Sequence, residues 1–104
     1  MQIMQGDAYD IEIILADEDD QIVSAAGVED VEFVLGNVRK TLLTGGVAYD
    51  PSITAWVMRV TQAETQNMYG TLMLEGRVKL LGGDVVGVKV EEIRIIRAQS
   101  REVL

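Results

Sequence analysis

The chain has 104 residues, of which 48% are hydrophobic and 25% charged, so it is large enough for one domain with a packed core. It contains no Cys and no His, which excludes disulfides, thiolate nucleophiles, the usual zinc sites and a Ser-His-Asp triad within the chain. Its net charge of −8 argues against binding to nucleic acid or to anionic membrane surfaces.

Alternation of apolar and polar residues with a period of two predicts strands along most of the chain. The expected strands cover residues 9–15, 31–35, 38–43, 47–49, 53–60, 72–80 and 85–97, and residues 21–23 are compatible with a resumption of the first strand. Turn-forming residues separate them at Asp17-Glu18-Asp19-Asp20, Gly36-Asn37, Gly45-Gly46, Asp50-Pro51 and Gly82-Gly83-Asp84. A shift in the phase of the last strand at Glu91-Glu92 predicts a β-bulge there.

The strand at 53–60 is the best candidate for a central strand, because both of its faces are largely apolar. Trp56 lies in it, and we interpret this residue as a core anchor rather than as a ligand contact. Phe33 is also expected in the core, because it shares one face of the strand at 31–35 with Val31 and Leu35.

A short helix is predicted at residues 61–68, between the strands at 53–60 and 72–80. Thr61-Gln62-Ala63-Glu64 fits a capping box, with the Thr61 side chain capping the helix and the Glu64 side chain reaching back to the Thr61 amide. Gly70 follows as a stop signal. About two helical turns are not stable alone, so the helix must pack on a sheet.

About seven short strands, with turn signals every ~8–12 residues and no longer helix, favour an all-β, antiparallel β-sandwich of Greek-key type. The chain is expected to form one domain over residues 1–104, with a polar tail at 97–104. No apolar run approaches the ~20 residues of a membrane helix, and the N-terminus lacks the pattern of a signal peptide. We therefore expect synthesis in the cytoplasm without membrane insertion.

The negative charge is concentrated in the first half of the chain. Residues 1–50 hold 11 acidic and two basic side chains, a net charge of −9, whereas residues 51–104 hold six acidic and seven basic, a net charge of +1. The run Asp17, Glu18, Asp19 and Asp20 lacks the spacing of a Ca²⁺ loop. It is interpreted as a solvated turn, with a weak cation site or an acidic interaction surface as alternatives.

Nothing in the sequence predicts catalysis or a cofactor. Paired carboxylates could serve a glycosidase, but no aromatic platform accompanies them, because the chain has only five aromatic residues. Neither glycine pair is followed by the Lys and helix of a phosphate-binding loop. We expect no enzyme activity, no metal site and no cofactor.

The order of several short motifs is more informative than any one of them. Gly6-Asp7 precedes the first long strand, Phe33 lies in Val31-Glu32-Phe33, and Thr61, Glu64 and Thr65 are followed by Gly70 and by Arg77-Val78. Over residues 3–97 this ordered set resembles the N-terminal domain of phage baseplate upper proteins, and small stand-alone relatives in tailed phages and prophages of Gram-positive bacteria. One position departs from the family pattern, since Gly76 stands where Gln is usual.

The resemblance implies an immunoglobulin-like β-sandwich that serves as a structural component of a tail or baseplate. It implies other tail or baseplate proteins, or copies of the chain itself, as partners, and a path from the bacterial cytoplasm into the virion. It carries no catalytic residues. The alternative is a carbohydrate- or ligand-binding β-sandwich module, which requires exposed aromatic side chains.

Overall fold

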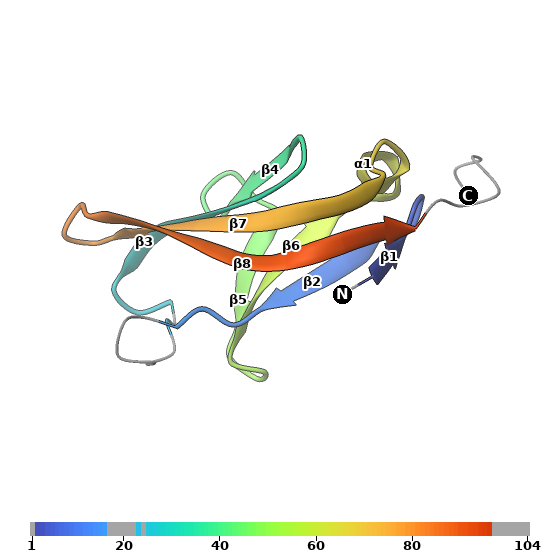
Figure 1. Ribbon diagram of the computed structural model, residues 1–104. Helices are drawn as coiled ribbons and strands as arrows, with labels where there is room; N and C mark the ends of the chain where they lie inside the picture. The colour runs from blue at the N-terminus through green and yellow to red at the C-terminus, as the bar shows by residue number, and fades with distance from the viewer. Residues whose placement is uncertain (1, 17–22, 24, 97–104) are drawn as a thin grey trace.

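The computed structural model describes residues 2–16, 23 and 25–96, which form eight strands and one short helix (Figure 1). A five-stranded sheet has the order β1-β8-β7-β3-β4 and a three-stranded sheet has the order β2-β6-β5. The elements are β1 (Gln2–Met4), β2 (Tyr9–Ile13), β3 (Val28–Leu35), β4 (Val38–Thr41), β5 (Val47–Asp50), β6 (Ala55–Val60), α1 (Gln62–Gln66), β7 (Gly70–Leu80) and β8 (Val85–Ile96). The protein is mostly β and resembles a sandwich, as the sequence pattern predicts.

The prediction of a purely antiparallel sandwich with about seven strands is wrong at the N-terminus. All seven expected strands are present, with altered ends, but β1 is an additional strand and it pairs in parallel with Arg94–Ile96 of β8. Three residues are too few to show a periodic pattern, so alternation does not predict β1. The chain then crosses to β2 of the other sheet, which allows β1 and β8 to run in the same direction.

The predicted turns are confirmed in both hairpins of the larger sheet. Leu35 pairs with Val38 across Gly36-Asn37, and the Leu80 amide donates to the Asp84 carbonyl (2.9 Å) across the glycine pair. The bulge in β8 lies close to the predicted place but not at it. Leu74 pairs with Glu91 and Glu75 with Lys89, so Val90 is the extra residue.

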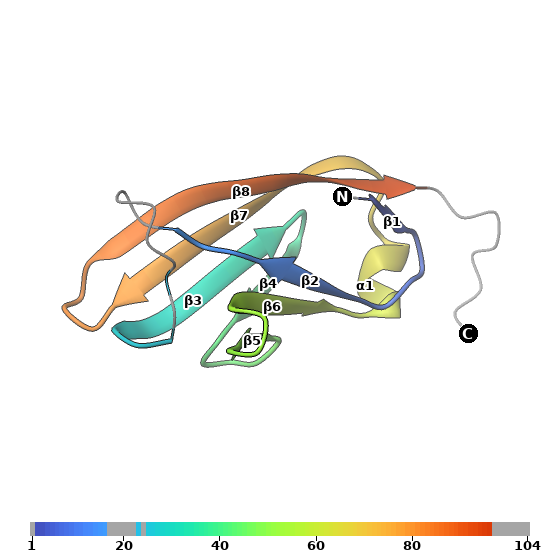
Figure 2. The ribbon, with the colours of Figure 1, turned by 90° about the horizontal axis from the view of Figure 1, so that it is seen from below.

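The strand predicted at 53–60 begins at Ala55 instead, because Thr54 has a positive φ of 54° and belongs to the preceding turn. Its inward face is buried as expected, and Trp56, Met58 and Val60 are all fully buried. The two sheets, whose strands are seen from below in Figure 2, enclose one hydrophobic core. The core side chains are Ile3, Ile11, Ile13, Leu15, Val31, Phe33, Leu35, Val47, Trp56, Met58, Val60, Met68, Leu74, Val78, Ile93 and Ile95.

Trp56 and Phe33 are both 0% exposed, which confirms their predicted places in the core. The Trp56 indole Nε1 donates to the Val23 carbonyl (2.9 Å), so the polar edge of the ring is satisfied inside the protein. The Tyr49 ring packs edge-on against Trp56 with 5.1 Å between ring centroids. Trp56 therefore fills the core and binds Val23 through its indole.

The helix and its cap form as predicted, although α1 is shorter than the expected span of 61–68. The Glu64 amide donates to Thr61 Oγ1 (3.2 Å) and the Thr61 amide donates to Glu64 Oε1 (2.9 Å), which completes the capping box. Met68, just beyond the helix, turns into the core and is 5% exposed. Within the described part of the chain, no helix has the length and apolar character to cross a membrane.

Candidate functional site

One end of the molecule is closed by a connection that docks on the helix. The Gln5 side chain donates from Nε2 to the carbonyls of Gln66 (3.0 Å) and Met68 (3.1 Å). The Gly6 amide donates to Thr65 Oγ1 (3.1 Å), and the same hydroxyl donates to the Asp7 carbonyl (2.7 Å). We call this arrangement of residues 5–7 on α1 the docked corner.

Thr65 is the centre of the docked corner. It is 0% exposed, and its hydroxyl satisfies one donor and one acceptor of the β1–β2 connection. Gly6 fits because its φ is 88° and because a Cβ there would lie only 2.7 Å from Gln66 Oε1. The positive φ is what favours glycine here, because the Gln66 side chain is flexible and its end could move away from a Cβ.

Five of the residues that carry the phage-family resemblance come together at this corner: Gly6, Asp7, Thr61, Glu64 and Thr65. Their contacts satisfy backbone groups and cap a helix, so their role here is structural. The sequence predicts the roles of Thr61 and Glu64 but not the docking of Gln5 and Gly6 on the helix. Thr65 is the buried residue of the helix, but a threonine among polar residues does not show this in the sequence.

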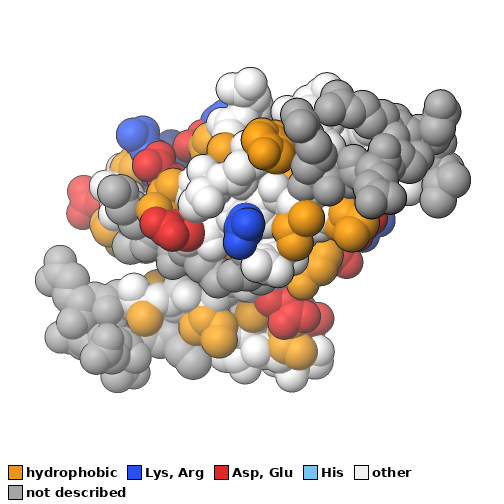
Figure 3. Space-filling view, turned by 45° about the vertical axis from the view of Figure 1, so that its right-hand side comes forward, with side chains coloured by type: hydrophobic (Ala, Val, Ile, Leu, Met, Phe, Trp, Pro, Cys, Tyr) orange, Lys and Arg blue, Asp and Glu red, His pale blue; other side chains and the backbone are white. Residues whose placement is uncertain are grey.

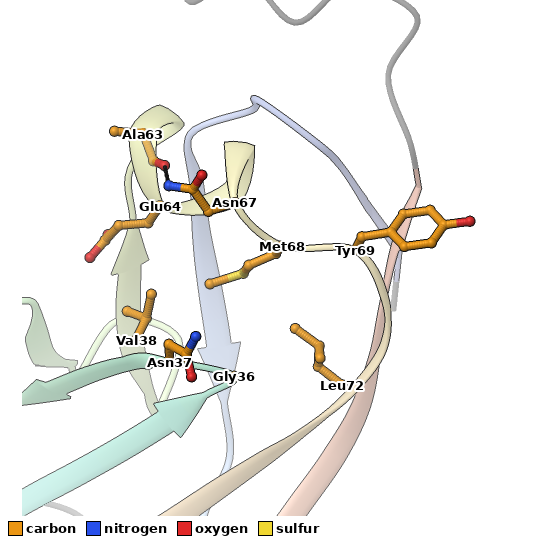
Figure 4. Close-up of a pocket in the computed structure, with 9 residues that line it drawn as sticks. All are labelled: Gly36, Asn37, Val38, Ala63, Glu64, Asn67, Met68, Tyr69 and Leu72. Carbon is orange, nitrogen blue, oxygen red and sulfur yellow. Dashed lines mark hydrogen bonds between the residues drawn. The ribbon is translucent and has the colours of Figure 1, made fainter.

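A pocket of about 710 Å³ lies beside the docked corner, between α1 and the β3–β4 hairpin (Figure 4). Val38, Met68 and Leu72 provide apolar walls, while Asn37 and Asn67 provide amides. The Asn67 Nδ2 donates to the Ala63 carbonyl (3.2 Å). Figure 4 shows the Tyr69 ring pointing away from Val38 and Met68, so the pocket has no aromatic platform for a sugar ring.

Glu64 is the acidic side chain of this pocket, and it is held in the charged form. Partial burial raises its pKa, but the hydrogen bonds from Thr61 and the ammonium of Lys40, whose Nζ lies 2.9 Å from Oε2, outweigh that effect. The pKa of Glu64 therefore lies below its usual value. A carboxylate with these partners ties β4 to α1 and is not prepared to act as a general acid near neutral pH.

The opposite end of the molecule is open and apolar. The hairpin of β7 and β8, with strands of 11 and 12 residues, projects beyond the three-stranded sheet (Figures 1 and 2). Its end carries Leu80, Leu81, Val85 and Val86, which are 36%, 69%, 57% and 52% exposed. We call these four side chains the hairpin tip.

The outer edge of β8 beside the hairpin tip has no strand on it among the described residues. β7 pairs along the inner edge, whereas β1 covers only Arg94–Ile96 on the outer edge. We call Val85–Ile93 the open edge of β8, because no described residue pairs with it on that side. The other edge strands are shorter, with three to five residues each, and β2 shields its edge with exposed Asp10 and Glu12.

The predicted acidic surface at Asp17, Glu18, Asp19 and Asp20 lies outside the described residues, as does the tail at 97–104. Elsewhere, several acids of the first half are paired with bases. Asp10 pairs with Arg59 (3.0 Å), Glu29 with Lys79 (3.6 Å) and Glu32 with Arg39. The view in Figure 3 shows hydrophobic side chains in several groups among polar and charged ones.

In the part of the chain that the structure describes, no three or more acidic side chains are grouped so that they could hold a metal ion. Comparison of the sequence with models of known protein families and with curated proteins found no match.

Proposed function

We propose that the chain is a non-enzymatic structural or assembly protein that acts through protein–protein contacts. The observation that carries this proposal is the open edge of β8 next to the exposed hairpin tip. A long edge strand with apolar side chains at its end is a template for pairing with another chain, and soluble proteins usually shield such edges. The open end of the molecule is therefore the contact region.

We further propose that the assembly is the tail or baseplate of a phage or prophage virion, with other tail or baseplate proteins or further copies of the chain as partners. This step rests on the resemblance of the ordered motifs. Their gathering at the docked corner gives support, because a structural role for these residues agrees with a family that shares a fold and no chemistry. On the same basis we propose that the sandwich is immunoglobulin-like.

A ligand-binding module remains the second candidate because the pocket beside α1 offers apolar walls and two amides. The side chains that favour sugar binding are not arranged for it, since Trp56 is fully buried and the Tyr69 ring points away from the pocket. A glycan array that gave a clear hit, abolished by Asn37→Ala, would favour this candidate over assembly.

Particle composition tests the proposed function directly. Phage particles are induced from the strain that encodes the chain, purified by density gradient, and analysed by mass spectrometry. We expect the chain in the purified particles in a fixed ratio to the other tail proteins. Particles that contain those proteins but lack the chain would contradict the virion assignment.

A further inference from the structure

We propose that the open edge of β8 selects an extended segment of a partner protein that carries an acidic side chain, which passes over Gly87 and pairs with Arg77. The residues on either side of that acid are apolar and cover Val86. This inference names the chemistry of the partner at the contact region and rests on the proposed assembly function.

A partner strand has one regular stretch of β8 to pair with. The connection at residues 81–84 precedes this stretch, the extra residue Val90 interrupts the ladder after it, and β1 covers Arg94–Ile96. Residues 85–89 remain, with Gly87 in the middle. A segment that adds to them places one residue beside Gly87 and that residue's two neighbours on the other face of the sheet.

The fold of the chain itself does not require glycine at position 87. Gly87 is not among the residues with a positive φ, and a Cβ built there meets no heavy atom of the described residues within 4 Å. That Cβ would project from the outer face of the sheet, because Gly87 pairs with the exposed Arg77. Glycine inside a strand weakens it and often marks a place that another group approaches closely. The free surface over Gly87 is therefore suited to a side chain of a partner.

Arg77 is available for such a side chain. It stands opposite Glu32 in the register, but Glu32 pairs with Arg39, and Arg77 has no acid partner among the described residues. Glu75, two positions along the same face of β7, does not pair with it either. Four other bases each have an acid partner: Arg39, Lys40, Arg59 and Lys79. A guanidinium without an acid forms strong, charge-assisted hydrogen bonds with a carboxylate.

Strand spacing allows the two side chains to meet above the glycine. Neighbouring strands lie about 4.8 Å apart, so the partner residue beside Gly87 has its Cα about 10 Å from that of Arg77. Gly87 places no side chain between them. In the row nearer the turn, Val85 stands between the edge and Lys79, and Lys79 already pairs with Glu29 (3.6 Å). The row of Gly87 is thus the place where an acid gains a free base.

The inner face of the same stretch favours apolar neighbours. Val86 pairs with Val78, which is 6% exposed, so both side chains lie on the face toward the core. Val86 is nevertheless 52% exposed, because the hairpin extends beyond the smaller sheet (Figure 2). Apolar side chains of the partner on this face would remove Val86 from water. The expected pattern of the segment is therefore apolar, acidic, apolar.

The net charge of −8 is compatible with one acid at this place. At physiological ionic strength, exposed charges more than about 8 Å apart are largely screened, whereas the carboxylate over Gly87 would be in contact with Arg77. Asp84 is exposed in the connection before β8, so the acid of the segment belongs beside Gly87 and not beside that connection.

Titration with capped peptides, followed by NMR, tests the proposal. The probes are acetyl-Thr-Val-Glu-Val-Thr-amide and the same peptide with Gln or Lys in place of Glu. We expect the Glu peptide to shift the amide signals of residues 85–89 and to bind about fivefold more tightly than the Gln peptide, with the Lys peptide the weakest. Equal binding of the three peptides, or no shift in β8 at about 5 mM of the Glu peptide, would overturn the proposal.

Reversal of the charge at position 77 sharpens the test. Arg77→Glu should reverse the order of affinities, so that the Lys peptide binds most tightly. Arg94→Gln is the matched control, because Arg94 is also exposed and without an acid partner among the described residues, but β1 covers the edge beside it. This variant should keep the wild-type preference. An unchanged preference in Arg77→Glu would contradict the pairing.

Gly87→Thr tests the path over the glycine. Threonine favours strands and its Cβ has free space, so the variant should be at least as stable as the wild type in thermal melts. Its side chain would stand between Arg77 and the partner, so the preference for the Glu peptide should be lost. A less stable variant would mean that the glycine serves the fold, and a retained preference would contradict the path.

The peptide titration and the composition of purified particles fail independently. If no peptide is selected but the chain is present in particles, the proposed function stands and this inference is wrong. Selection of the Glu peptide together with absence of the chain from particles would contradict the virion assignment alone.

Discussion

The two ends of the molecule differ in how far their backbone groups and apolar side chains are satisfied within the fold. At the docked corner, a buried threonine, a glutamine and a capping box satisfy the backbone groups of two segments that lie about 60 residues apart in sequence. At the other end, the hairpin tip exposes Leu81, Val85 and Val86 beside a strand edge that nothing in the described residues covers. Contacts within the chain satisfy the first end, whereas the second end exposes apolar side chains and a strand edge among the described residues.

The sequence motifs and the candidate contact region lie at opposite ends of the molecule. Motif residues such as Gly6, Thr61 and Thr65 meet at the closed end, where they hold the fold together. The open end is built mainly from leucine, valine and glycine residues with no distinctive spacing. The sequence motifs therefore mark the docked corner, whereas the candidate contact region is visible only in the three-dimensional structure.

The largest difference in stability is expected between a substitution in the core and one in the hairpin tip. Trp56→Ala removes a fully buried ring, its hydrogen bond to Val23 and its contact with Tyr49, and should lower the free energy of unfolding by about 3–5 kcal/mol. Leu81→Ala, 69% exposed, should change it by less than about 0.5 kcal/mol. Urea denaturation of both variants measures this, and a large loss for Leu81→Ala would mean that the tip is part of the core.

Thr65→Val tests whether the hydrogen bonds of the docked corner stabilise the fold. The valine keeps the shape but leaves the Gly6 amide and the Asp7 carbonyl without their partner, which should cost about 1–3 kcal/mol. Thr71→Val, the same change at an exposed position of β7, is the matched control and should be close to neutral. Equal effects in denaturation experiments would contradict the role of Thr65.

The helix cap should contribute less to the free energy of unfolding than the Thr65 hydroxyl does. Thr61→Ala removes the side chain that accepts from the Glu64 amide, and we expect a loss of about 1 kcal/mol. Gln62→Ala, in the same helix but outside the cap, tests for a general effect of alanine and should be nearly neutral. If Thr61→Ala were as neutral as its control, the capping box would contribute nothing to the closed end.

The smallest effect concerns pH. Because the pKa of Glu64 is lowered in the folded chain, its carboxylate stabilises the fold above its ordinary pKa of about 4.5, and this contribution is lost as the pH falls through the lowered value. Glu64→Gln should be less stable than the wild type at pH 7 by at most about 1 kcal/mol, with the difference shrinking below pH 4.5. Thermal melts at pH 7 and pH 3 measure it; a difference that grew in acid would contradict the assignment.

Much of the fold could be predicted from local sequence, and the reasons are visible in particular residues. Alternation located seven strands, and the capping box at Thr61 and Glu64 located the helix, because these signals are local. β1 was missed because three residues carry no period and its partner in β8 lies about 90 residues away. The bulge was placed one residue late because periodicity marks a change of face, not the residue left unpaired.

The candidate contact region was the least predictable part. Val85 and Val86 read as ordinary strand residues, and their exposure follows from the smaller sheet ending short of the hairpin, which only the packing of the two sheets decides. The acidic run that the sequence suggested as an interaction surface, Asp17 to Asp20, lies outside the described residues and stays a prediction.

Amide hydrogen exchange by NMR tests the central claim most directly, because it reads the open edge residue by residue. As the concentration of the purified chain rises, or as a purified tail protein is added, exchange in β8 should slow within Val85–Ile93, while amides of the docked corner such as Gly6 stay unchanged. Protection that appears elsewhere, or β8 exchange that responds to neither concentration nor partner, would contradict the account.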